Sequence, residues 1–346
     1  MSSFQSRHTM GFVALLLGLI SLIIILYLGG VGEIIVIALL LAYILNPLVT
    51  GLEQRGVDRG LASGLILLAV VGVGALTWFV VFPIALEEVQ HLGSGNASAQ
   101  AHKAVDAVQA FIDSHFNYLG IGKLDLNHEV GQLKSTLAER IPAALIEGSI
   151  TVVIGLVLTP FLMFFFLKDG SQIKRYFISL VPNRYFEFAM DLQHKMDTQL
   201  GNYLRGQFVD AFVFGILATI TLWILGVPFF VFAGVFAGFA NLIPFVGPIA
   251  GALAASLIVL VEQGDLGRVG YVFLAFVILK LIDDFVVQPI AVGKTVDIHP
   301  IAVALGIMVA GHFFGVVGML LVVPFTGFLR VVLEESVQTY RKYKFD

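Results

Sequence analysis

Four polar residues that could bind a solute or carry a proton lie together in the sequence. Lys280, Asp284 and Gln288 follow one another at intervals of four residues, and Asp283 lies three residues after Lys280. This spacing predicts that the first three share one face of a helix, with Asp283 at its edge. One lysine neutralises only one carboxylate, so the other is left for a proton, a substrate or another partner. The alternative is that Lys280 simply pins two helices together.

Three further polar residues are candidate binding groups because their surroundings in the sequence are apolar. Asp210 lies near the cytoplasmic end of a predicted span, where it could bind an ion or act as a helix cap. Asn241 falls in a predicted helix break, where it could bind solute or satisfy freed backbone groups. His312 falls in a second predicted break, where it could relay a proton or be hydrogen-bonded within the packing.

Motifs of known enzyme classes are absent from the sequence. It contains no Gly-x-Ser-x-Gly, no His-Glu-x-x-His and no phosphate-binding loop. Asp283 and Asp284 are adjacent, so on a regular helix their side chains point about 100° apart and cannot share a proton as an aspartic-protease pair does. We therefore expect a protein that is not an enzyme, with no cofactor, no metal site and no ATP hydrolysis of its own.

The helices that position these residues must be surrounded by lipid. Of 346 residues, 58% are hydrophobic and only 13% are charged, and the mean hydropathy is +0.94. Soluble domains carry about 25% charged residues, and a soluble chain could not bury so much apolar surface in one core. The composition excludes a soluble enzyme, a disordered chain and a nucleic-acid-binding protein. With no Cys, disulfides and thiolate metal sites are excluded too.

The pattern of apolar runs predicts an all-α polytopic membrane protein. Simple spans of suitable length are predicted at 11–28, 34–49, 61–85, 149–167, 208–225 and 270–287. Two tracts, 228–261 and 300–332, are too long for one span and are interrupted near their middles. Each is interpreted as two helices joined by a break, either a re-entrant hairpin or two short spans. The candidate hinge residues are Pro244, Gly247, Pro248, Pro289, Pro300, Gly311, Gly315 and Gly318.

The distribution of basic residues orients this arrangement. With a cytoplasmic N-terminus, 14 Lys and Arg fall in inner loops and five in outer loops, as the positive-inside rule requires. Both termini are then cytoplasmic. The predicted segments are N-terminal membrane helices (1–86), an amphipathic helical insertion on the outer face (87–147), a membrane helix with a basic cytoplasmic linker (148–205), a transport core (206–335, with broken tracts at 228–262 and 300–333) and a cytoplasmic tail (336–346).

A repeated unit is visible in the second half of the sequence. A span containing acidic residues precedes each broken tract, and Pro228 and Pro300 are each followed six residues later by glycine. Each unit crosses the membrane an odd number of times, so the two copies would be inverted. Inverted repeats of broken helices are typical of secondary transporters with a binding site at the midplane. The alternative is chance recurrence of Gly and Pro in glycine-rich membrane helices.

Several motifs together resemble one known family. They are Asn241-Leu-Ile-Pro-Phe-Val-Gly-Pro248, Asp284-Phe-Val-Val-Gln-Pro-Ile-Ala-Val-Gly-Lys294 with His299-Pro300, Gly311-x-x-x-Gly315-x-x-Gly318 with Val323-Pro324, and Ala42-Tyr43-x-x-Asn46-Pro47-Leu48 with Arg55-Gly56. The chain resembles the autoinducer-2 exporter (AI-2E) family of bacterial and archaeal permeases over nearly its whole length. The resemblance implies a multi-pass cell-membrane exporter of a small polar solute such as autoinducer-2, which acts in quorum sensing, and a homo-oligomer for which a pentamer is a candidate.

One departure from the family pattern bears on the coupling ion. Members often have a single Asp followed by Asn, whereas this chain has Asp283-Asp284. The extra carboxylate favours coupling to a proton or cation. The leading hypothesis is therefore a proton-coupled exporter of a small polar solute that works by alternating access, with Asp284 or Asp283 taking the proton. The alternatives are a sodium/proton antiporter and, from another class, a structural membrane scaffold that holds a partner through residues 87–147.

Overall fold

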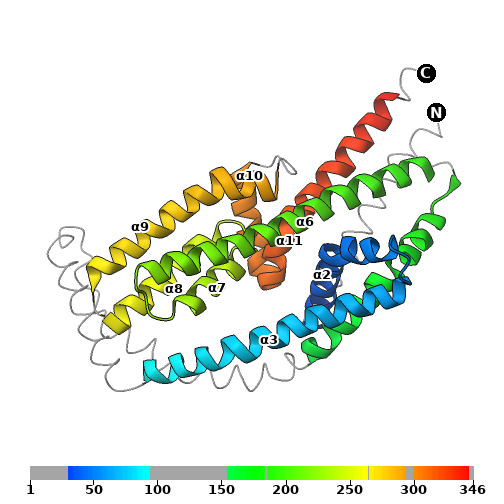
Figure 1. Cartoon of the computed structure of the whole chain (residues 1–346). Helices are drawn as coiled ribbons and strands as arrows, with labels where there is room; N and C mark the ends of the chain where they lie inside the picture. Colours follow the sequence, from blue (N-terminus) through cyan, green and yellow to red (C-terminus); the bar gives the residue numbers. More distant parts are fainter. Residues whose placement is uncertain (1–29, 94–153, 184–185, 264, 294–298, 343–346) are drawn as a thin grey trace. The chain divides into compact units, whose positions relative to one another are not determined.

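The computed structural model describes residues 30–93, 154–183, 186–263, 265–293 and 299–342. Every regular element in these ranges is a helix (Figure 1), which confirms the all-α class. Among them, five helical segments are long and apolar enough to cross a membrane: Gly30–Glu53, Arg59–Leu76, Ile154–Ser179, Ala189–Ile224 and Ile301–Val332. The predicted span at 11–28 and residues 94–147 of the predicted insertion lie outside the described residues.

The described chain divides into two compact units that are not contiguous in sequence. Unit 1 takes the chain up to Gly72, the stretch that ends at Phe208, and everything from Ala291 onward. Unit 2 takes the stretch that begins at Val73 and residues 209–290. Two long helices, α3 (Arg59–Gly93) and α6 (Phe186–Ile224), run from one unit into the other. Each unit is described by itself below.

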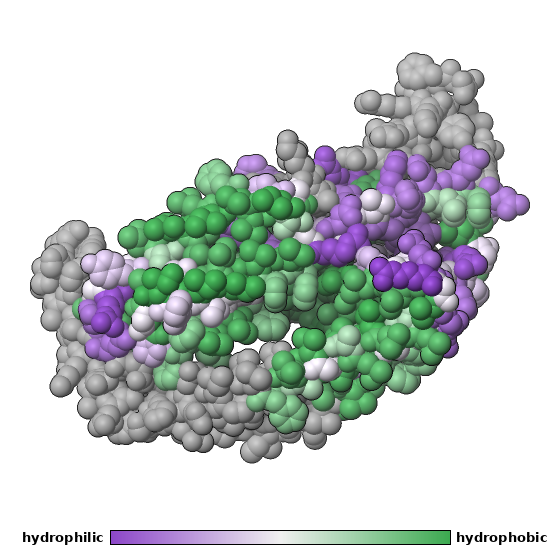
Figure 2. All heavy atoms as spheres, viewed as in Figure 1, coloured by the Kyte–Doolittle hydropathy of each residue, from purple (hydrophilic) through white to green (hydrophobic). Residues whose placement is uncertain are grey.

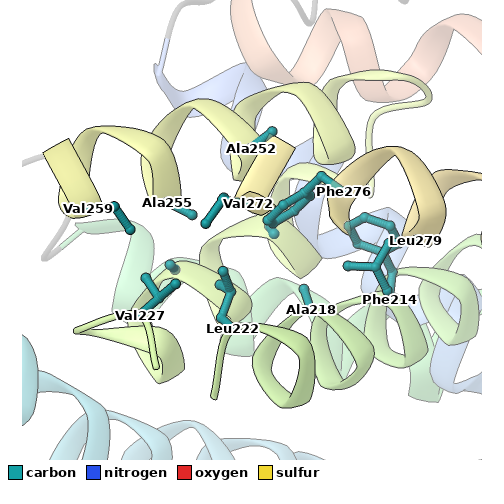
Figure 3. Close-up of a cluster of buried hydrophobic side chains, with 12 residues drawn as sticks. Phe214, Ala218, Leu222, Val227, Ala252, Ala255, Val259, Val272, Phe276 and Leu279 are labelled. Atoms are coloured by element: carbon teal, nitrogen blue, oxygen red, sulfur yellow. The ribbon is translucent and has the colours of Figure 1, made fainter. Parts of the chain in front are cut away.

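Four helices form the core of unit 2. The C-terminal part of α6 packs with α7 (Phe230–Ala240), α8 (Val246–Gln263) and α9 (Leu266–Ile282) (Figure 1). Figure 3 shows their shared cluster of buried side chains, in which Phe214 of α6 faces Phe276 of α9 with ring centroids 6.5 Å apart. Small alanines at the α7–α8 contact let these two helices pack closely, because they add little volume between the backbones.

Local signals explain where these helices begin and end. Asp265 caps α9, since its side chain accepts hydrogen bonds from the backbone N–H groups of Gly267 and Arg268. Between α7 and α8 the chain leaves the helix at residues 241–245, and a Cβ placed on Gly251 would lie 2.6 Å from the Cβ of Ala237. Contact between residues on either side of the break means that α7 and α8 fold back on each other as a helical hairpin.

The helix that begins with α9 changes its hydrogen bonding before it ends. A π-helical turn, Asp283–Val287, follows α9 directly and leads into the short α10 (Gln288–Ala291). The backbone N–H of Gln288 bonds the carbonyl of Asp283, five residues earlier. Pro289 follows at once. Proline has no N–H and its ring disturbs the preceding turn of an α-helix, so a wider π turn is a suitable way to approach it.

Unit 1 has a core built from three segments of its own. α2 (Gly30–Glu53), the start of α3 and the helix Ile154–Ser179 bury a cluster that includes Ala42, Ala62 and Met163. The guanidinium group of Arg59 ties the three together, because it donates to the Leu167 carbonyl oxygen at 3.0 Å and to Asn46 Oδ1 at 3.2 Å.

The last element of unit 1, α11 (Pro300–Lys342), is a second helical hairpin. Gly315 interrupts it with φ 58° and ψ −148°, a conformation that side chains other than glycine rarely adopt. On either side of this turn the two halves face each other: a Cβ on Gly311 would lie 2.5 Å from Met319 Cε, and one on Gly306 would lie 2.6 Å from Val322 Cγ1. The turn falls within the predicted break at 311–318. The inverted relation of the two hairpins stays a prediction.

Large apolar side chains cover the outer faces of the membrane helices. Figure 2 shows hydrophobic residues, in green, over α9 and the C-terminal half of α6. Phe212, Trp223 and Tyr271 are each about two-thirds exposed, which would be costly in water but is favourable in lipid. Together with the span lengths, this surface identifies a multi-pass membrane protein.

The contact of α6 with α7 generates a prediction about packing. A Cβ on Gly234 would lie 2.6 Å from Thr219 Cα, which is backbone and cannot turn aside. We expect Gly234→Ala to lower the melting temperature in detergent micelles or nanodiscs, by the equivalent of about 1–3 kcal/mol, because overpacking forces backbone shifts. Gly74→Ala is the matched control, since a Cβ on Gly74 meets nothing within 4 Å. Equal melting temperatures for the two variants would contradict the close approach.

Candidate functional site

A charged cluster in unit 2 centres on Lys280, near the end of α9. The Nζ atom of Lys280 lies 3.0 Å from Asp283 Oδ2 and 2.7 Å from Asp284 Oδ1. The Asp283 side chain is completely buried, whereas that of Asp284 is 42% exposed. Lys280 therefore contacts both carboxylates, of which only that of Asp283 is buried within the protein.

The π-helical turn changes which residues share a face. The spacing predicted Lys280, Asp284 and Gln288 on one face, with Asp283 at its edge. In the structure the amide Nε2 of Gln288 instead donates to Asp283 Oδ2 at 3.2 Å. The reason is the extra residue in the turn, which rotates everything after Asp283 relative to a regular α-helix. Asp283, not Asp284, is consequently the carboxylate at the centre of the cluster.

A second carboxylate enters the cluster from α6. Asp210 is completely buried, and its Oδ2 accepts a hydrogen bond of 3.0 Å from Asn241 Nδ2. Asn241 lies at the end of α7, where the hairpin turn begins, and is itself 2% exposed. The position of Asn241 depends on Gly247, because a Cβ there would lie 2.5 Å from the Asn241 Cβ. Asp210 lies well inside α6 and is buried, so of its two suggested roles the structure does not fit that of a helix cap, and ion binding stays a prediction.

The two halves of this cluster meet within unit 2. The α7–α8 turn contacts both halves, since Asn241 bonds Asp210 and the ring of Phe245 lies against Lys280. Six of the seven predicted binding residues thus belong to this cluster: Asp210, Asn241, Lys280, Asp283 and Gln288, with Asp284 at its exposed edge.

Sequence reasoning missed one member of the network. The ring of Phe245, in the α7–α8 turn, lies beneath Lys280 Nζ, with 5.7 Å between the nitrogen and the ring centroid. A cation over an aromatic face gains electrostatic stabilisation where water is scarce. Phe245 has φ 68°, which is unusual for a bulky residue. The only signal in the sequence was an aromatic residue between Pro244 and Gly247.

The other predicted residues belong to unit 1 or to the turns. His312 lies just before the hairpin turn of α11; its side chain is exposed, with its ring against Phe313 at 5.1 Å between centroids. Gly311, Gly315 and Gly318 belong to the same hairpin, and Pro300 begins it. Pro244 lies in the α7–α8 turn, and Gly247 and Pro248 lie at the start of α8. Their roles as hinges stay predictions.

Unit 1 contains a separate polar cluster that the sequence did not indicate. Asp197 of α6 accepts a hydrogen bond of 2.5 Å from the Tyr43 hydroxyl and forms an ion pair of 2.6 Å with Lys174. The ammonium of Lys174 also lies 5.1 Å from the centroid of the Tyr43 ring. These residues come from three helices, so the cluster joins α2, the helix Ile154–Ser179 and α6.

The burial of Lys280 between two carboxylates generates a second prediction. Lys280→Met leaves Asp283 as an uncompensated buried charge, and breaking such a pair costs about 3–5 kcal/mol, so a marked fall in melting temperature is expected. Asp283→Asn added to Lys280→Met should recover part of the loss. Lys195→Met is the control, because its ion pair with Asp191 is exposed and such pairs contribute about 1 kcal/mol or less. Indistinguishable losses for the two lysines would argue against a buried ion pair.

Comparison with known proteins agrees with these features. The model of a family described as "AI-2E family transporter" matches residues 12–338. The chain is similar to "Putative transport protein YrrI" of Bacillus subtilis, at 25% identity over 86% of this chain and 84% of the relative. It is also similar to "Putative permease PerM" of Escherichia coli K12, at 25% identity over 90% of this chain and 88% of the relative. With a match that spans both hairpins and the buried cluster, the chain belongs to the AI-2E transporter family.

Proposed function

We propose that the protein is a secondary transporter in the cell membrane that exports a small polar solute in exchange for protons, by alternating access. Its membership of a transporter family supports the role in transport. The observation that carries the proton coupling is the charge balance of the buried cluster. Within the described residues, the cluster contains three carboxyl groups, those of Asp210, Asp283 and Asp284, and one ammonium group, that of Lys280, which contacts Asp283 and Asp284.

This imbalance favours proton uptake. Charges within membrane helices are costly unless they are paired, and they commonly mark ion or proton pathways. One lysine compensates one carboxylate, so binding of a proton lowers the uncompensated charge. Gain and loss of that proton would alter the pairing of Lys280 with Asp283. We expect the resulting conformational change to begin in the π-helical turn, because this turn carries Asp283.

The same cluster contains groups suited to a neutral polar solute. The side-chain amides of Asn241 and Gln288 each contain a donor and an acceptor, which suits a small hydroxylated molecule such as an autoinducer-2-like polyol. Both amides bond buried carboxylates in the present arrangement, so a change in protonation would also change their availability to solute. We further propose a homo-oligomer, with a pentamer as the candidate, and cytoplasmic termini.

The proposal is tested by flux in proteoliposomes. We expect Asp283→Asn and Asp284→Asn each to reduce pH-driven flux of a panel of small polyols about tenfold or more, because a charge-assisted hydrogen bond is worth about 1.5–3 kcal/mol. Asp191→Asn is the control, since Asp191 lies outside the cluster and forms an exposed ion pair with Lys195. Undiminished pH-dependent flux in both cluster variants, with intact assembly, would refute the assignment.

The second candidate, a sodium/proton antiporter, is favoured by the surplus of carboxylates around Lys280. It predicts that a sodium gradient moves protons across vesicles containing the protein, and that neutralising both Asp283 and Asp284 abolishes this movement. A pH-sensitive dye inside the vesicles reports it. Proton movement driven by sodium without any polyol flux would select the antiporter, and polyol flux without a sodium response would select the exporter.

A further inference from the structure

The buried cluster contains two carboxyl oxygens that have no hydrogen-bond donor. Asp210 and Asp283 have no exposed surface, and each uses Oδ2 for its hydrogen bonds, to Asn241 in one case and to Lys280 and Gln288 in the other. The Oδ1 atom of each is buried without a partner among the described residues. A buried acceptor with no donor is costly, so the two Oδ1 atoms without a donor call for a physical explanation.

The two carboxyl groups belong to one cluster. Asp210 lies on α6 and Asp283 at the start of the π turn, and one turn after Asp210 the ring of Phe214 contacts Phe276 of α9. Asn241, which bonds Asp210, and Phe245, which lies against Lys280, come from the same α7–α8 turn. Ionised carboxylates have only acceptors, so a hydrogen bond between them requires that one carries a proton. Two ionised carboxylates buried in one cluster repel each other, and a proton shared between them removes one of the two charges.

The neighbouring groups do not remove the need for this proton. Among the described residues, Lys280, from α9, is the cation in contact with Asp283, and it is shared with Asp284, which lies closer to its Nζ than Asp283 does. Asn241, from the α7–α8 turn, and Gln288, from α10, are neutral amides that donate to the two Oδ2 atoms. With both pair members ionised, two buried negative charges would have less than one ammonium between them.

We propose that Asp210 and Asp283 form a carboxyl pair that binds a single shared proton. The proton sits between the two Oδ1 atoms as an O–H donated by one carboxyl group to the other. The pair then carries one negative charge, which Lys280 compensates. Asp284 serves as a second countercharge for Lys280 and does not hold this proton. The inference refines the proton coupling proposed above, although the existence of the bound proton does not depend on transport.

Infrared difference spectroscopy of the full chain in nanodiscs tests this directly. A protonated carboxylic acid has a carbonyl stretch that is separate from the bands of a carboxylate. We expect the wild type to show a buried acid band that vanishes as the pH is raised. The band should be absent in Asp210→Asn and in Asp283→Asn, because the new amide can donate to the remaining carboxylate. It should persist in Asp284→Asn and in the exposed control Asp191→Asn. Melting temperature and size-exclusion profile establish that each variant is folded.

Three results would overturn the shared proton. They are a band that survives Asp210→Asn, a band removed by Asp284→Asn alone, and a band removed by sodium at constant pH, which would mean that a cation occupies the pair. The flux assay separates this inference from the proposed function. A band that follows the expected pattern with pH-independent flux would remove proton coupling but leave the shared proton in place. Flux that depends on pH without the band would remove the shared proton but leave proton coupling in place.

Discussion

The pairing of Lys280 with buried carboxylates is the interaction on which the arrangement of unit 2 depends. An ammonium group among apolar helices must have a counter-charge nearby, since the cost of leaving it alone exceeds what local packing can supply. Asp283 provides that charge from one turn away, at 3.0 Å. Because Asp283 is buried, its partners must come from within the protein, and Gln288 supplies a second donor to the same oxygen.

The π-helical turn reconciles this pairing with the proline that follows. Pro289 cannot continue a regular ladder of hydrogen bonds, and the extra residue in the turn allows the helix to reach it. The same extra residue brings Gln288 to Asp283 and leaves Asp284 at the exposed edge. One irregularity in the backbone thus decides which of two adjacent aspartates is buried. Irregular turns of this kind recur at functional sites because they position side chains that a regular helix would not.

Close backbone contacts supply the rest of the geometry. Asn241 can reach Asp210 because α7 and α8 fold back at residues 241–245, and Gly247 leaves room for Asn241 at that turn. Helices in lipid gain little from hydrophobic burial against each other, so they rely on small residues and on polar contacts between helices. Unit 2 uses both devices at the same place, where glycine contacts bring the helices together and the Asp210–Asn241 bond fixes them.

The sequence alone determined the environment of the chain and the identity of the polar residues that matter. Composition required lipid, run lengths located most of the helices, and the charges left inside apolar runs were Asp210, Lys280, Asp283 and Asp284. The motifs also indicated the family. These features are local, so they can be read without knowing which segments meet.

Only the tertiary structure decided how those residues are paired. Periodicity placed Gln288 with Asp284, because it assumes a regular helix and carries no information about a π turn. It also left ion binding and helix capping open for Asp210, since nothing in the sequence states that residues 210 and 241, on different helices, bond each other. Contacts between segments far apart in the chain depend on how close two backbones can approach, and that is a property of the packed helices and not of any one stretch of sequence.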